Sequence, residues 1–89
     1  MATRRQNEQE FRHWDELPNG GRRYWRDRKG RVHGFQRIVK VVDAEENTLL
    51  VVQEVYNEQG ELVERHQKFP QDTGHEIIKP EVDKEEDDS

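Results

Sequence analysis

The sequence predicts a small, mainly β domain in which four strands form an antiparallel meander, either open or curled into a half barrel. Of its 26 hydrophobic residues, sixteen lie between Val32 and Phe69, and many of these are valine, isoleucine or aromatic, the types that favour a pleated sheet. Turn signals divide this stretch at regular intervals. Because the connections are so short, we expect successive strands to pair antiparallel.

Three turn segments separate the expected strands: 27–30, 43–47 and 57–60. In the first and last, an Asp or Asn side chain can brace a type I turn, and a glycine supplies the positive φ of the bulge that follows. In the middle segment Asn47 can take the left-handed conformation. The predicted strands are therefore 22–27, 32–43, 48–57 and 61–69.

The segments outside the meander are shorter and more polar. Phe11 and Trp14 are three residues apart, which favours a helical turn within 6–16 that faces the sheet. Pro18 and the glycines after it end that helix, and 76–79 is expected to be a brief extended piece before Pro80.

The domain organisation follows from the distribution of charge. Residues 1–40 carry eleven Lys and Arg against five Asp and Glu, whereas 41–89 carry four against fifteen. The last nine residues hold six acids and one lysine, which equals the whole net charge of -5. We expect a flexible N-terminus over 1–10, one β domain over 11–79 and a disordered acidic tail over 80–89.

Composition excludes several classes of chemistry. The chain has no cysteine, and its one serine is Ser89 in the acidic tail, so thiol and serine nucleophiles are not expected. The four histidines show no HxH, HxxxH or HExxH spacing, so neither a metal nor another cofactor is predicted. The absence of a long apolar run predicts a cytoplasmic protein without a membrane partner.

Turn geometry also fixes a register, in which Asp43 faces Thr48 and Asn57 faces Glu61. The expected pairs are Val42 with Leu49, Ile38 with Gln53, Arg37 with Glu54, Val55 with Val63, Gln53 with Arg65, Val51 with Gln67 and Leu49 with Phe69. In the first hairpin, Tyr24 is expected opposite Gly34 and Trp25 opposite His33, so that the tyrosine ring fills the space a glycine leaves.

This register predicts a sheet that is apolar on both faces, although a single layer in water should alternate between apolar and polar residues. One face collects Ile38, Val42, Leu49, Val51, Val55, Val63 and Phe69. The other is the predicted interaction face: Phe35, Val39, Val41, Leu50, Val52, Tyr56 and Leu62. The terminal segments can cover one face, and the second then needs a partner.

A basic and aromatic segment provides an alternative binding site. Arginines attract phosphates and flat rings stack on unpaired bases, a combination that indicates weak single-stranded nucleic-acid binding. The residues concerned are Arg22, Arg23, Trp25, Arg26, Arg28 and Lys29. Arginine also serves to blunt an edge strand, which explains the same residues without a ligand.

A polar row is predicted across three strands, formed by Arg37, Glu54 and Glu64, with His66 further along the same face. Two facing carboxylates repel, so one of them can keep its proton as a general acid does. The simpler interpretation is a structural ion-pair row. Asp72 and His75 can likewise meet across a turn near His66, although capping by Asp72 and a positive φ at Gly74 explain that loop equally well.

The function expected from these patterns is that of a small non-catalytic module that binds itself or another protein through the apolar sheet face. A homodimer satisfies this expectation because it covers the second face with a copy of itself.

Overall fold

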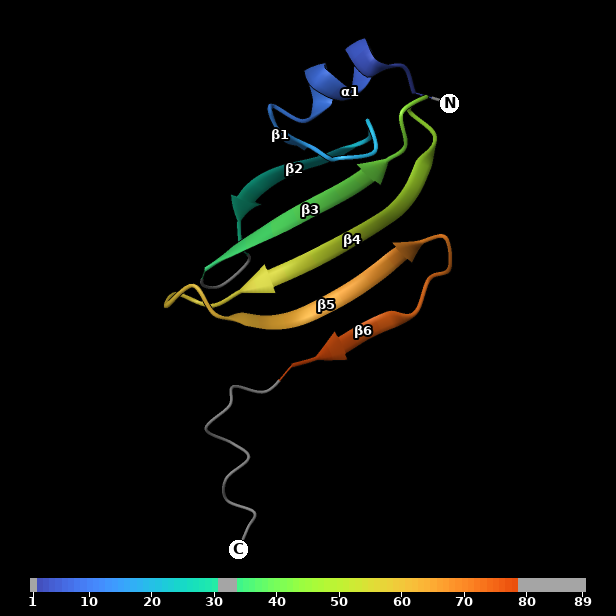
Figure 1. Cartoon of the computed structure of the whole chain (residues 1–89). Coiled ribbons are helices and arrows are strands. Elements are labelled where there is room, and N and C mark those ends of the chain that lie inside the picture. Colours follow the sequence, from blue (N-terminus) through green and yellow to red (C-terminus); the bar gives the residue numbers. More distant parts are fainter. Residues whose placement is uncertain (1, 31–33, 79–89) are drawn as a thin grey trace, which may run out of the picture.

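The computed structural model describes residues 2–30 and 34–78 and shows one open antiparallel sheet with a short helix at its N-terminal end (Figure 1). The strands lie in chain order, so each pairs with the next and β1 and β6 form the edges. The elements are α1 (Arg4–Glu10), β1 (His13–Glu16), β2 (Arg22–Lys29), β3 (Phe35–Val42), β4 (Thr48–Tyr56), β5 (Leu62–Phe69) and β6 (Gly74–Ile77). The predicted mainly β meander is confirmed, but the described residues form six strands, not four.

The first additional strand is β1, where the sequence predicts a helix through residue 16. The helix ends at Glu10, and Trp14 pairs with Tyr24 as part of a hairpin with β2. The turn is closed by hydrogen bonds from Leu17 N to Gly21 O (2.9 Å) and from Gly20 N to Leu17 O (3.0 Å). A spacing of three between two aromatic residues therefore does not identify a helix here, because the backbone of β1 finds its partners in the hairpin.

The second additional strand is β6, which the sequence indicates only as a brief extended piece without a partner. Four residues of β6 pair with β5, from Glu64 opposite Ile77 to Gln67 opposite Gly74. Because pairing with β5 satisfies one row of backbone groups, even so short a segment becomes part of the sheet.

Helix α1 is held at its start by a capping box between Thr3 and Gln6, in which each side chain satisfies a free backbone N–H of the first turn. The core lies beneath the helix and consists of Phe11, Tyr24 and Val42, with Trp14 and Ile38 packed against it. A helix of seven residues is marginal by itself, so its stability depends on this packing.

The register of β3 with β4 is confirmed over most of its length, with Arg37 opposite Glu54 and Ile38 opposite Gln53. At its end the prediction is wrong, because an irregularity between Val41 and Val42 places Val42 opposite Thr48. The expected pair of Val42 with Leu49 is therefore not formed.

The predicted register of the first hairpin is wrong. Tyr24 lies opposite Lys40 and Trp25 opposite Val39, because β2 continues to Lys29 and the connection is longer than the predicted turn. Gly34 instead closes this hairpin by accepting from Gly30 N (3.0 Å). A Cβ there would lie 1.9 Å from Tyr56 O, and φ is +67°, so Gly34 allows a close approach to β4. His33 lies outside the described residues.

The predicted register of β4 with β5 is also wrong beyond the turn. Irregularities between Val55 and Tyr56 and between Val51 and Val52 place Glu54 opposite Arg65 and Val55 opposite Glu64. Each extra residue in a bulge moves the side chains that follow it to the other side of the sheet. Val63 therefore does not face Val55, and Gln53 faces His66 instead of Arg65.

Among the residues that the structure describes, no helix has the length and apolar character needed to cross a membrane.

Candidate functional site

The two faces of the sheet differ in what covers them. One face, which we call the helix face, carries Tyr24 and Lys40 and contacts α1 through Phe11, Asn7 and the buried Glu46. The other, which we call the open face, carries Trp25, Val39 and their neighbours in register, and no helix or further strand of the described residues packs over it.

All seven residues of the predicted interaction face share the open face, because direct cross-strand partners point the same way. The register pairs Phe35 with Tyr56, Val39 with Val52, Val41 with Leu50 and Tyr56 with Leu62. Val39 and Val52 are 5% and 3% exposed, so they are buried and add little exposed surface. The other five are half-buried, so the open face presents a partly exposed apolar surface.

Aromatic rings and guanidinium groups stack over this surface. Trp25 is stacked on the His13 ring at 5.6 Å and has the Arg23 guanidinium 5.1 Å from its centroid. Phe35 and Tyr56 are stacked at 4.7 Å between centroids. The Arg37 guanidinium lies between these groups, 5.7 to 5.9 Å from the rings of Trp25, Phe35 and Tyr56. The aromatic groups on this face are thus held in a fixed arrangement.

The polar groups of the open face are oriented by hydrogen bonds. Arg37 binds both oxygens of Asp27, at 2.7 and 3.0 Å, and this contact raises the pKa of Arg37. Tyr56 donates to Glu54 at 2.8 Å. Burial, followed by this bond to Glu54, raises the pKa of Tyr56. Arg37 and Glu54 are therefore fixed next to each other at the centre of the face.

The predicted polar row is only partly formed. Arg37 and Glu54 lie opposite each other as expected, but the bulge between Val55 and Tyr56 moves Glu64 and His66 to the helix face. The residue that faces Glu54 is Arg65, so the two carboxylates do not meet and the predicted general-acid pair is not formed.

A complete charged row crosses the open face instead, one residue from each of five strands. The register pairs Asp27 with Arg37, Arg37 with Glu54, Glu54 with Arg65, and Arg65 with Glu76. Opposite charges are neighbours at every step, which stabilises a sheet surface. We call these five residues the charge row; sequence reasoning missed Arg65 and Glu76 because the bulges and β6 were not predicted.

On the helix face, β5 and β6 bring together two histidines and two carboxylates. His66 Nε2 lies 2.6 Å from Asp72 Oδ1, which lowers the pKa of Asp72. His75 binds Glu64, and the two imidazole rings are 4.4 Å apart. The predicted turn is confirmed, because Asp72 accepts from Gly74 N at 2.9 Å and Gly74 has φ 75°. The described residues contain no group of three or more ligands that could hold a metal ion.

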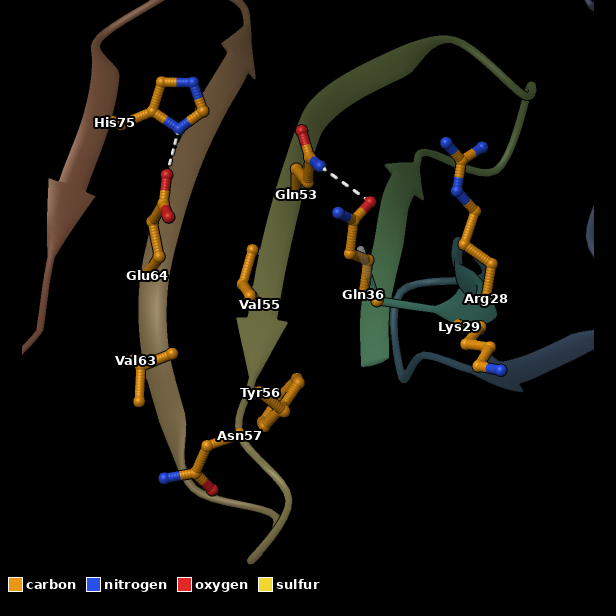
Figure 2. Close-up of a pocket in the computed structure, with 11 residues that line it drawn as sticks. Arg28, Lys29, Gln36, Gln53, Val55, Tyr56, Asn57, Val63, Glu64 and His75 are labelled. Atoms are coloured by element: carbon orange, nitrogen blue, oxygen red, sulfur yellow. Dashed lines mark hydrogen bonds and ion pairs between the residues drawn. The ribbon is translucent and has the colours of Figure 1, made fainter. Parts of the chain in front are cut away.

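An open pocket of about 760 Å³ occupies the half of the helix face that α1 leaves free (Figure 2). Arg28 stands at one side and Glu64 with His75 at the other, and the Gln36 and Gln53 amides are joined between them at 3.1 Å. The lining offers hydrogen bonds and both signs of charge, but it contains no serine, threonine or cysteine that the imidazole could activate.

The basic segment of β2 is divided between the two faces by strand alternation. Arg22 is buried and bound to Glu8 at 2.7 Å and Glu16 at 3.0 Å. Arg23 and Arg26 are paired with Asp15 and Glu10 at 3.6 and 3.4 Å. Trp25 and Lys29 share the open face, whereas Arg28 lies with Arg22 and Arg26 on the helix side. These residues do not form one continuous basic surface, and nucleic-acid binding stays a prediction.

Comparison of the chain with protein-family models, with curated proteins and with solved structures gives no significant match.

Proposed function

We propose that this protein is a small non-catalytic interaction module that binds a protein partner through the open face. The observation that carries the proposal is the contrast between the two faces. The helix face has a buried core under α1, whereas the half-buried apolar and aromatic side chains of the open face have no cover among the described residues. Exposed apolar surface of this kind is characteristic of binding sites.

The composition of the open face supports a protein as the partner. Tyrosine, tryptophan and arginine are the residues enriched at the centres of protein interfaces, and on the open face the Arg37 guanidinium lies close to the rings of both Trp25 and Tyr56. The charged groups of this face balance, with acidic Asp15, Asp27, Glu54 and Glu76 against basic Arg23, Lys29, Arg37 and Arg65. A balanced surface suits a protein better than a polyanion.

Site-specific photo-crosslinking in cells that make this protein tests the proposal. Leu50 belongs to the open face, whereas Ile77 of β6 is paired with Glu64 on the helix face and is 67% exposed. We expect a photo-reactive residue at position 50 to form a defined protein adduct, and the same residue at position 77 to form much less of it. Equal labelling, or no adduct at either position, would contradict the proposal.

A further inference from the structure

The open face has a pattern that is complementary to itself. The charge row alternates in sign across β2 to β6, and apolar residues flank it on both sides. Phe35, Tyr56 and Leu62 lie next to it in one direction along the strands, and Val39 with Val52 lie next to it in the other. A partner that fits must therefore present alternating charges at the strand spacing, between two apolar rows.

We propose that the partner is a second copy of this chain, packed open face to open face about a two-fold axis that runs along the strands between β3 and β4. This inference rests on the proposed function and names its partner. The axis exchanges β3 with β4 and β2 with β5. Arg37 of one copy then faces Glu54 of the other, and Asp27 faces Arg65.

The same axis also matches the apolar residues. It brings Phe35 against Tyr56 of the second copy, Val39 against Val52 and Val41 against Leu50, since these residues are cross-strand partners within one copy. Two sheets that pack in this way have nearly aligned strands, at the separation found in β-sandwiches. The contact is isologous, so every pair occurs twice.

Two-fold axes that lie on a strand or along the charge row do not satisfy the charges. A two-fold axis along β4 places Glu54 of one copy on Glu54 of the second copy, and Arg37 on Arg65. An axis along the charge row places each of its residues on the same residue of the second copy. Both arrangements oppose like charges, which is unfavourable in an interface. The alternation of sign restricts the axis to the space between two neighbouring strands. Of these positions, the one between β3 and β4 also places Phe35 on Tyr56 and Val41 on Leu50.

The test is charge reversal in two separate variants, Arg37→Glu and Glu54→Arg, measured by sedimentation velocity with the full chain. Each variant alone places like charges together twice in its homodimer, and we expect its association to weaken by about tenfold or more. In an equimolar mixture, the carboxylate introduced by Arg37→Glu meets the guanidinium introduced by Glu54→Arg, and the two unchanged residues meet in the second contact. The mixture should therefore form a heterodimer at concentrations where each variant alone is monomeric.

Circular dichroism establishes that both variants are folded, since each also changes the charge row within its own chain. If either fails to fold, Leu50→Lys replaces the pair, with Ile77→Lys on the helix face as its control, and loss of association in Leu50→Lys alone supports the inference. Monomeric wild-type protein, or folded variants whose mixture gives no heterodimer, would overturn it. If photo-crosslinking at position 50 then gives an adduct with a different protein, the proposed function stands and only the dimer is refuted. If it gives no adduct, the proposed function and the dimer are both refuted.

Discussion

The carboxylate of Glu46 joins α1 to the sheet. It accepts hydrogen bonds from Tyr24 Oη at 2.5 Å and Asn7 Nδ2 at 3.1 Å, and Arg4 Nε lies 3.3 Å away. Glu46 is buried and has φ 69°, a left-handed conformation that costs a non-glycine residue about 1 kcal/mol or more. The network of contacts compensates for this strain and for the burial of the charge.

Replacement of Tyr24 by phenylalanine tests the network. Tyr24→Phe removes one donor from a buried carboxylate, and we expect the free energy of unfolding to fall by about 1 to 3 kcal/mol. Tyr56→Phe is the matched control, because it removes a bond of 2.8 Å to the half-buried Glu54, and should cost about 1 kcal/mol or less. Urea unfolding measures both; equal losses would show that Glu46 has no special role.

Stability should also depend on pH through this carboxylate. Burial alone would raise the pKa of Glu46, but hydrogen bonds from Tyr24, Asn7 and Arg4 outweigh it and lower the pKa below its ordinary value. A lowered folded-state pKa stabilises the native protein above the unfolded-state pKa, and this stabilisation is lost as the pH falls through the folded-state value. The pKa values of Asp43 and Asp72 are also lowered. Both carboxylates therefore contribute stability that is likewise lost on acidification.

Unfolding in urea at a series of pH values from about 7 down to about 3 measures this dependence. We expect the wild-type protein to lose stability steadily on acidification and Glu46→Gln to lose less over the same range, although it starts from a lower value. Parallel curves for the two proteins would contradict the assignment of a lowered pKa to Glu46.

At the scale of elements, the close approach of the β2 to β3 connection to β4 depends on Gly34. Gly34→Ala places a methyl group against Tyr56 O in a left-handed backbone, and we expect a loss of about 3 kcal/mol or more. Gly60→Ala is the control, because Gly60 has φ +83° but open space around it, and should cost about 1 kcal/mol. Thermal unfolding compares them, and a Gly34→Ala protein as stable as the control would refute the contact.

The elements also show what the sequence could predict. The β3 to β4 hairpin was predictable because Asp43 and Asn47 are turn-forming residues, and Asp43 N and Asn47 O close the turn. The left-handed conformation predicted for Asn47 is adopted by Glu46 instead. The bulge between Val55 and Tyr56 was not predictable, since no residue type in the sequence requires a bulge there. That one irregularity removed Glu64 and His66 from the predicted polar row and placed Arg65 opposite Glu54. The edge strands β1 and β6, four residues each, were too short for a periodic pattern.

At the scale of the whole molecule, one short helix covers only part of a six-stranded sheet. Phe11 is the largest apolar group that α1 and its C-cap contribute to the core, and no element of the described residues covers the open face. The shared face of the seven residues of the predicted interaction face could be predicted from the sequence, because β3 and β4 pair almost without irregularity and Leu62 precedes the bulge in β5. The charge row could not be predicted, because it depends on the register of the five strands from β2 to β6.

The most direct test of the central claim, that the open face pairs with a second copy, is light scattering of the wild-type chain over a range of concentrations. Pairing of the open faces predicts a mass that rises from the 10.7 kDa of one chain to that of two. Ile77→Lys on the helix face should leave this rise unchanged, and Leu50→Lys should abolish it. A wild-type mass that stays at 10.7 kDa at every concentration, or a rise that survives in Leu50→Lys, would contradict the claim.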